Sequence, residues 1–232
     1  MTIHSLPVIG GLPTPSYDIT QQQELEDQKL EKIASLYAQA FANSPWNEYK
    51  KCPKGHYFGK DVSESAATCL APNCTESLSL YYPLQETKTY ITQEMAHLNG
   101  TLFTCEKNAD VVGAGWGFSY QPEEFATEKY KTLPMQEKII ALFKEKNGEG
   151  PFFYISEVMV DQGVRKNGIA TKIATALTKR AQELAQNIIM RTSVDSPMAL
   201  IGSKLYMEEI LTPGADEEHD KRIIFFREHQ SG

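Results

Sequence analysis

A mostly apolar run in the second half of the chain is followed by an amphipathic segment. From Phe152 to Val160 most residues are aromatic, β-branched or otherwise apolar, which is the composition of a largely buried strand. From Ile169 onward, apolar residues recur at a spacing of three and four, and charged residues occupy the positions between them. This pattern predicts a strand, a turn that contains Gly168, and a helix.

The same two periodicities predict the other elements. Helical spacing occurs over residues 22–41, 86–100, 134–148 and 196–209. Strand-like runs occur over residues 101–106, 111–120, 187–194 and 221–228. The order predicts an α/β fold in which a mixed, mostly antiparallel central sheet has flanking helices and one central βαβ crossover. We expect an extended arm or a short edge strand over residues 1–20, where Pro and Gly are frequent, and one domain over residues 21–232.

Three of the four cysteines lie in a segment that is poor in large aliphatic residues and cannot build a core of its own. The spacing is Cys52-x3-His56, then twelve residues, then Cys69-x4-Cys74. Three thiolates and one imidazole in two turn-containing pairs suit a tetrahedral structural Zn²⁺ site, with no position left for water. Cys105 could replace His56 as the fourth ligand, and the alternative is an exposed loop with free thiols.

Charge and hydropathy exclude some classes of protein. Lys and Arg total 23 against 30 for Asp and Glu, a net charge of −7, which argues against a nucleic-acid partner. The first residues lack a cationic export signal, and no run of eighteen apolar residues occurs, so we expect no membrane partner and a cytoplasmic protein.

The turn before the predicted central helix carries a family resemblance. Residues 165–170 read Arg-Lys-Asn-Gly-Ile-Ala and fit the pattern Arg/Gln-x-x-Gly-x-Gly/Ala. This segment resembles the acyl-CoA pyrophosphate loop of the GNAT superfamily of N-acyltransferases, and the predicted element order is similar to theirs over residues 21–228. Against that family the chain has a possible zinc-stapled insertion at about 50–78 and a helical insertion at about 121–150. The alternative is a glycine turn that only caps a helix.

The resemblance implies a set of residues that bind acetyl-CoA. Backbone N–H groups of the loop would hold the pyrophosphate, and they belong to Arg165, Lys166, Asn167, Gly168, Ile169 and Ala170. Thr171 would add a hydroxyl. The edge formed by Val158, Met159 and Val160 would pair with the pantetheine arm. The Asn that the family usually has early in the following helix is replaced within residues 196–202, and Ser196 could bind pantetheine in its place.

The resemblance also implies two catalytic residues. Glu157 lies where many family members carry an acidic residue that removes the ammonium proton, so it is the candidate general base. Tyr206 lies in a Leu-Tyr-Met-Glu segment similar to the family's Leu-Tyr-Glu element, whose phenol protonates the CoA thiolate. A solvent-facing strand carboxylate and a core tyrosine are the respective alternatives.

These expectations combine into one function. The chain is expected to be an acetyl-CoA-dependent N-acetyltransferase that acetylates a primary amine of a small, polyamine- or aminoglycoside-like molecule, since net acidity favours a cationic acceptor. A protein or peptide amine is the alternative acceptor. A different class of function is a CoA-binding sensor without catalysis, or a zinc-stabilised protein-interaction module.

Overall fold

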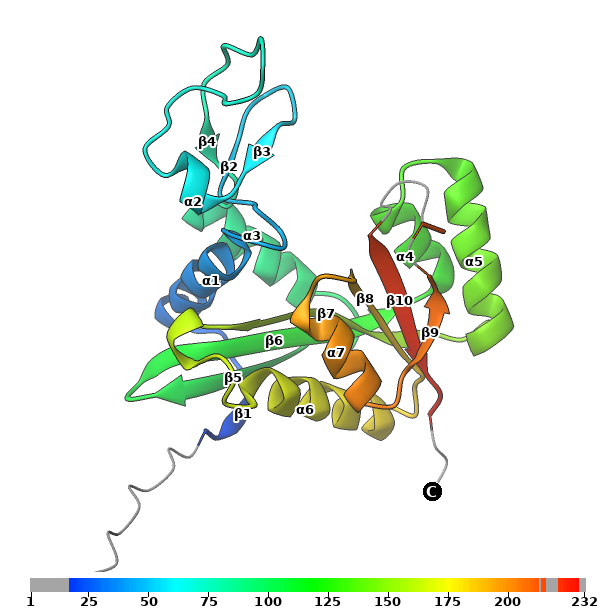
Figure 1. Ribbon diagram of the computed structural model, residues 1–232. Coiled ribbons are helices and arrows are strands. Elements are labelled where there is room, and N and C mark those ends of the chain that lie inside the picture. Colours follow the sequence, from blue (N-terminus) through cyan, green and yellow to red (C-terminus); the bar gives the residue numbers. More distant parts are fainter. Residues whose placement is uncertain (1–16, 213, 216–220, 230–232) are drawn as a thin grey trace, which may run out of the picture.

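A computed structural model describes residues 17–212, 214–215 and 221–229, so most of the predicted arm lies outside the described residues. The described part contains a central seven-stranded sheet (Figure 1). Its strands, in spatial order, are β1 (Ile19–Gln22), β5 (Thr101–Lys107), β6 (Asp110–Tyr120), β7 (Phe152–Val160), β8 (Ile188–Ser193), β10 (Arg222–Arg227) and β9 (Glu208–Leu211). Only β7 and β8 pair in parallel among these strands. The predicted mixed, mostly antiparallel sheet with one central crossover is confirmed.

Helices cover both faces of this sheet (Figure 1). They are α1 (Asp27–Phe41), α3 (Leu84–Met95), α4 (Pro122–Lys129), α5 (Leu133–Asn147), α6 (Ile169–Glu183) and α7 (Pro197–Lys204). The first four share one buried cluster with one face of the sheet, and α6 and α7 share a second cluster with the other face. No helix among the described residues is both long enough and apolar enough to cross a membrane.

Alternating glycines on β6 let α6 lie close to the sheet. A methyl group at Gly113 would lie 2.7 Å from Cγ2 of Ile169, and one at Gly115 would lie 2.6 Å from Cγ2 of Ile173. Such distances are too short for carbon atoms, so only glycine fits under the helix. The close approach fixes the first turns of α6, and with them the loop that precedes the helix.

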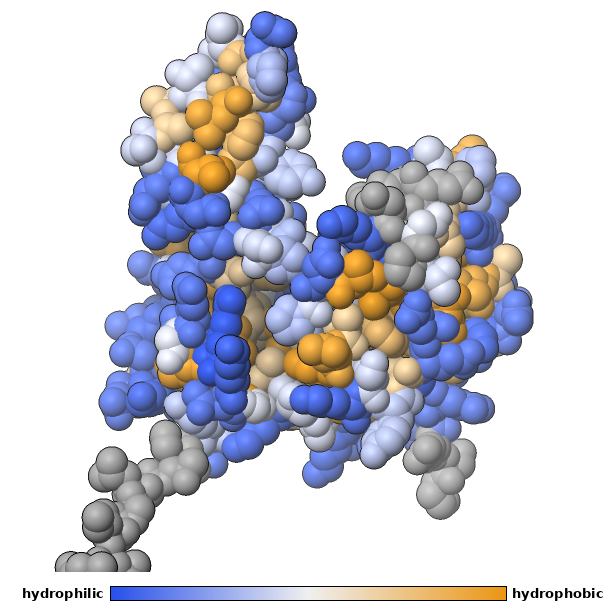
Figure 2. Space-filling model, in the orientation of Figure 1, coloured by the Kyte–Doolittle hydropathy of each residue, from blue (hydrophilic) through white to orange (hydrophobic). Residues whose placement is uncertain are grey.

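A separate lobe projects from the α1 side of the molecule between α1 and α3 (Figure 1). It consists of β2 (Lys50–Lys51), β3 (Tyr57–Phe58), the short α2 (Lys60–Ser63) and β4 (Ser79–Leu80). These strands form a three-stranded sheet in the order β3-β2-β4, and its own small cluster contains three cysteines. In the space-filling view a notch separates this lobe from the part of the molecule that carries α4 and α5 (Figure 2).

Two predicted helices lose residues to strands. Helix α1 begins at Asp27 rather than at residue 22, because Ile19–Gln22 pairs with β5 as an edge strand. Helix α7 ends at Lys204, and Glu208–Leu211 forms β9 against β10 instead of continuing the helix. In both cases strand pairing decides a stretch whose local pattern is ambiguous. Helix α4 lies inside the helical insertion expected at about 121–150, where the periodicity predicts a helix only over residues 134–148.

The two central strands separate halfway along their length. Strand β7 pairs with β8 at Phe153, Tyr154 and Ile155, while on its other edge it pairs with β6 as far as Val160. From residue 156 onward, one backbone edge of β7 therefore has no strand neighbour among the described residues. The candidate site lies at this separation.

Candidate active site

A β-bulge places two consecutive polar residues of β7 at the separation. Trp116 pairs with Glu157 and Gly117 pairs with Ile155, so Ser156 has no direct partner on β6. An extra residue bends a strand and redirects its side chains. Both Ser156 and Glu157 therefore line the same cavity.

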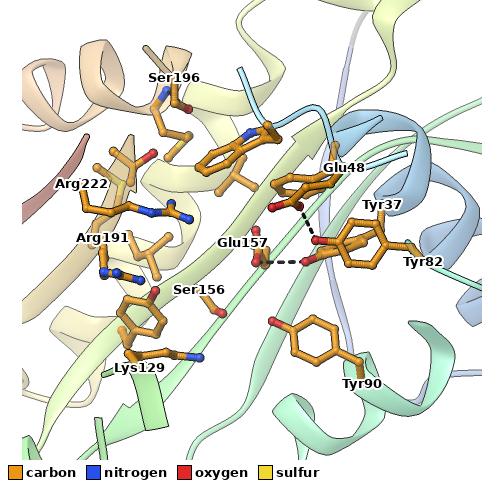
Figure 3. Close-up of a pocket in the computed structure, with 18 residues that line it drawn as sticks. Tyr37, Glu48, Tyr82, Tyr90, Lys129, Ser156, Glu157, Arg191, Ser196 and Arg222 are labelled. Carbon is orange, nitrogen blue, oxygen red and sulfur yellow. Dashed lines mark hydrogen bonds between the residues drawn. The ribbon is translucent and has the colours of Figure 1, made fainter. Parts of the chain in front are cut away.

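The cavity has a volume of about 180 Å³ and lies between the separated strands and α1 (Figure 3). Aromatic residues from several elements line it on the α1 and α3 side: Tyr37, Phe41, Trp46, Tyr82 and Tyr90. Strands β8 and β10 contribute Arg191, Thr192 and Arg222, and the start of α7 contributes Ser196 and Met198. The site is thus enclosed by segments that are far apart in the sequence.

Glu157 lies in the middle of this cavity (Figure 3). The Tyr37 hydroxyl donates a hydrogen bond to its Oε1 over 3.3 Å. The pKa of Glu157 is raised to about 8. Burial is the largest cause, the negative charges of Glu94 and Glu48 add to the increase, and the positive charges of Lys129 and Arg222 oppose it. A carboxyl group with such a pKa can exchange protons near neutral pH, as a general base requires.

A buried carboxylate that the sequence analysis missed organises the floor of the site. Glu94 on α3 is 3% exposed, and its Oε2 accepts hydrogen bonds from Nε1 of Trp116 at 2.6 Å and from Oγ of Ser156 at 2.7 Å. Nζ of Lys129 lies 3.6 Å from its Oε1. Glu94 shares the inner stripe of α3 with Ile91, so a charged residue in an apolar stripe was the signal that could have found it.

The base of the lobe forms one wall of the cavity. Trp46 and Glu48 precede β2, and Tyr82 follows β4. The Tyr82 hydroxyl donates a hydrogen bond to Oε2 of Glu48 (Figure 3). Burial raises the pKa of Glu48, although the hydrogen bond and Arg222 oppose that shift. Both connections between the lobe and the sheet domain therefore belong to the site.

The predicted phosphate loop has the geometry of an anion site. Gly168 is the N-cap of α6 with φ of 76° and ψ of 4°, a left-handed conformation, and nothing lies within 4 Å of the position that a Cβ would take. The first helical hydrogen bond runs from Lys172 N–H to Gly168 O, which leaves the N–H groups of residues 169–171 without helical acceptors. Such N–H groups at a positive helix end attract anions.

The structure divides the other residues predicted to bind acetyl-CoA among several places. Val158 and Ser196 line the cavity beside Glu157. Val160 and Arg165 line a neighbouring cavity of about 460 Å³, and Nε of Arg165 donates a hydrogen bond to Val160 O over 3.1 Å. Met159 and Ile169 are buried, Ala170 and Thr171 are half-buried, and Lys166 and Asn167 are exposed at the loop.

Tyr206 does not reach the cavity. Its side chain is 88% exposed, and it lies beyond the end of α7 with φ of 56°. The N–H of Met207 donates back to Gly202 O, so Tyr206 occupies the left-handed position that ends the helix. The expected role of Tyr206 as the acid for the thiolate has no support in this geometry.

The four predicted zinc ligands lie together at the tip of two turns in the lobe. Their ligand atoms all lie within 4.8 Å of one another. Nδ1 of His56 is 3.4 Å from Sγ of both Cys52 and Cys69, and Cys74 completes the group. Cys105 lies on β5 in the core of the sheet domain, so the structure brings His56 and not Cys105 to the cluster.

Hydrogen bonds within the first turn fix the position of the Cys52 thiol. Cys52 N–H donates to His56 O, and Gly55 N–H donates back to Cys52 O with a positive φ of 83° at Gly55. Burial disfavours the Cys52 thiolate, but hydrogen bonds from His56 and Lys54 outweigh it and lower the pKa of Cys52 to about 7. Three thiols and an imidazole at these separations fit the donor set of a structural Zn²⁺ ion.

Comparisons with known proteins agree with this geometry. The chain matches the Acetyltransferase (GNAT) family over residues 71–200. No protein among the curated sequences compared matches the chain significantly.

Several solved structures share the fold at low sequence identity. The crystal structure of histone acetyltransferase HPA2 and related acetyltransferase from Corynebacterium glutamicum has a TM-score of 0.58 at 13% identity, covering 94% of this chain and 99% of that chain. The polyamine N acetyltransferase of Drosophila melanogaster, which forms N acetylagmatine, has a TM-score of 0.53 at 10% identity, covering 91% and 100%. An N-acetyltransferase from Staphylococcus aureus has a TM-score of 0.51 at 12% identity, covering 92% and 99%.

The family match spans more than half of the chain, and it includes the separated strands, the glycine turn and helix α6. At these identities the solved structures show the fold alone. The chain belongs to the acetyltransferase (GNAT) family, whose cosubstrate is acetyl-CoA.

Proposed function

We propose that this protein transfers the acetyl group of acetyl-CoA to a primary amine of a small molecule. The observation that carries the proposal is Glu157, a half-buried residue that lines the cavity where β7 and β8 separate and whose carboxyl group has a pKa raised to about 8. The volume of about 180 Å³ is below the roughly 300–1,000 Å³ typical of sites for drug-sized ligands, which favours a small acceptor over a protein segment.

The cosubstrate would lie along the open edge of β7. Its pyrophosphate would bind the N–H groups at the start of α6, and its pantetheine arm would pair with the backbone of Val158–Val160. This arrangement directs the thioester toward Glu157, since residues 157 and 158 are adjacent on the strand. A backbone N–H of this edge would polarise the thioester carbonyl.

Glu157 would act as the general base. Its carboxylate would remove a proton from the acceptor ammonium, and the neutral nitrogen would attack the thioester carbonyl carbon. The C–N bond forms, the C–S bond breaks, and CoA leaves as the thiolate, which takes up the second proton that the nitrogen loses on forming the amide and so becomes the thiol. The hydrogen bond from Tyr37 holds the carboxyl group in place, and Trp116 and Ser156 hold the neighbouring Glu94.

The aromatic wall suits the amine end of the acceptor. Faces of Tyr and Trp rings attract cations, and Glu48 adds a second carboxyl group on the same side. The Drosophila structural neighbour acts on polyamines. For this chain, polyamine-like and other small primary amines are the acceptor classes to compare.

We further propose a structural Zn²⁺ ion in the lobe, held by Cys52, His56, Cys69 and Cys74. The lobe has only a small hydrophobic core to stabilise it. Its cluster of buried residues consists of three cysteines, with Phe58, Ala71 and Leu78 packed against them. A metal ion would hold the two turns together and so hold Trp46, Glu48 and Tyr82 at the cavity.

The first test is calorimetric titration of acetyl-CoA into the purified protein, followed by thiol release with a panel of amines. Binding with amine-dependent thiol release supports the proposal. Binding without release for every amine would instead favour a CoA-binding role without catalysis, and absence of binding would contradict both.

A further inference from the structure

The two sides of the cavity differ in charge (Figure 3). Glu157 on β7 and Glu48 near α1 provide carboxyl groups on one side. On the opposite side, Arg191 on β8 and Arg222 on β10 extend into the cavity toward Glu157. An acceptor that spans the cavity would therefore meet carboxyl groups at one end and guanidinium groups at the other.

Arg222 is held in an orientation that suits an anion. Its Cζ lies over the Trp46 ring, 4.6 Å from the ring centre. A cation–π contact of this kind leaves the N–H donors of the guanidinium available for hydrogen bonds to an anion. No carboxylate of the described residues forms an ion pair with Arg222.

Arg191 is the neighbour of Arg222 on the same face of the sheet. In the antiparallel pair of β8 and β10, Arg191 lies opposite Ile224, two residues from Arg222. Its Cζ lies 4.9 Å from the centre of the Tyr130 ring. Burial lowers the pKa of Arg222 and the positive charge of Arg191 lowers it further, against the opposing effect of Tyr154, Glu157 and Glu48. An anion bound between two like charges would remove this repulsion.

The third cation that lines the cavity already has carboxylate partners. Nζ of Lys129 lies 3.6 Å from Glu94 and 2.8 Å from Glu128. The anionic group is therefore assigned to the arginines and not to this lysine.

These observations indicate which amines the cavity would accept, provided that the protein carries out the proposed acetyl transfer. We infer that the acceptor is a small primary amine that also carries a carboxylate or phosphate group, and that Arg222, with Arg191 beside it, binds this anionic group. Planar guanidinium groups bind both kinds of anion through two parallel hydrogen bonds. The amine then lies at Glu157, and a second ammonium group at the far end would face two arginines.

The test compares acceptors that differ only in the anionic group. The panel contains phenylalanine with phenethylamine, 4-aminobutyrate with propylamine, and 2-aminoethyl phosphate with ethylamine, and it adds putrescine and agmatine as dications. Thiol release gives kcat/KM for each amine, and calorimetry with CoA present gives acceptor binding without turnover. We expect the acid-bearing member of at least one pair to be preferred by about 10- to 100-fold, the range of a charge-assisted hydrogen bond.

Variants of Arg222 assign the preference to this residue. Arg222→Met should remove the preference by lowering kcat/KM for the acid-bearing amine about 10- to 100-fold while changing that of its partner by less than about threefold. Arg222→Lys keeps the positive charge but cannot form two parallel hydrogen bonds, so its preference for the acid-bearing amine should lie between those of wild type and Arg222→Met. Arg180→Met on α6 is the matched control, and the melting temperature reports whether each variant folds.

The outcomes separate the inference from the proposed function. A preference for acid-bearing amines that Arg222→Met removes supports the inference, and the carboxylate and phosphate pairs identify the anion. Efficient acetylation of amines without an acid group, or of polyamines, with no effect of Arg222→Met, overturns the inference and leaves the acetyl transfer intact. Failure to bind acetyl-CoA overturns the proposed function itself.

Discussion

At the scale of single residues, the surroundings of Glu157 suit the proposed role of proton acceptor. Charged groups of Glu94, Glu48, Lys129 and Arg222 act on its carboxyl group, and desolvation is the largest cause of its raised pKa. Because the base form is the carboxylate, we expect the fraction of active enzyme to increase as pH rises through about 8.

Replacing Glu157 tests this role. Glu157→Gln keeps the shape but cannot accept a proton, so kcat should fall by about 10²–10⁴-fold at pH 8, and the rise of wild-type activity between pH 6 and pH 9 should disappear. The dissociation constant of acetyl-CoA should change by less than about twofold. The exposed Glu149→Gln is the matched control. Wild-type turnover in Glu157→Gln would remove it as the base.

Gly168 tests the phosphate loop. Gly168→Glu introduces a carboxylate in a left-handed position at the open end of α6, where it would repel the pyrophosphate. We expect acetyl-CoA affinity to fall by more than about tenfold. Gly148→Glu is the control, because Gly148 also has a positive φ, of 73°, and open space around it, but it ends α5. Equal losses in both variants would mean that strain, not phosphate binding, is being measured.

Tyr206 tests the end of α7. Tyr206→Phe should keep full turnover, because the exposed hydroxyl lies outside the cavity. Tyr206→Gly should raise the free energy of unfolding by roughly 0.5–1 kcal/mol, since glycine adopts the left-handed conformation without steric cost. Tyr206→Ala loses the ring but keeps the Cβ and should not be stabilised. A large loss of turnover in Tyr206→Phe would restore the phenol as the proton donor.

At the scale of elements, the lobe forms one wall of the cavity, and we propose that a metal ion holds this wall in place. We expect about one zinc atom per chain by elemental analysis, and chelation or Cys74→Ser should lower it. The loss should raise the KM for the amine, because Trp46, Glu48 and Tyr82 border the lobe, while acetyl-CoA affinity stays within about twofold.

Cys105→Ser is the control for metal content. Cys105 is buried on β5 away from the cluster, so this variant should keep its zinc even where it loses stability. Protein purified from zinc-containing medium could prove to contain no zinc and still show a normal KM for the amine. That result would contradict the proposed role of the lobe.

Most elements could be predicted because their periodicity is strong, as in Phe152–Val160 and the helix after Gly168. The cysteine cluster could be predicted from spacing, because its ligands come from two local turns. Glu94, Arg191 and Arg222 could not, because the cavity joins α3, β8 and β10, and only the folded sheet brings these together. Tyr206 matched a short pattern, but the helix ends one turn earlier than the pattern implied.

At the scale of the whole molecule, ionisation of Glu157 should lower the free energy of unfolding as pH rises. The folded pKa of Glu157, about 8, lies above the unfolded value of about 4.3–4.5. The folded state therefore binds more protons than the unfolded state between these values, and stability is lost as pH rises through this window.

A comparison of stability with pH tests this linkage. Between pH 5 and pH 8, wild type should lose on the order of 2–4 kcal/mol relative to Glu157→Gln, as measured by denaturant unfolding. Parallel stability curves for the two proteins would contradict the raised pKa.

The lobe leaves and rejoins the sheet domain at neighbouring points. Lys50 pairs with Leu80 and Lys51 with Ser79, so the two ends of the segment lie side by side on adjacent strands. A segment with adjoining ends can be inserted or deleted without rerouting the rest of the chain. Evolution, or a protein engineer, can therefore exchange this segment for another and so change one wall of the cavity, while helix α6 and strand β7, the proposed cosubstrate-binding elements, stay as they are.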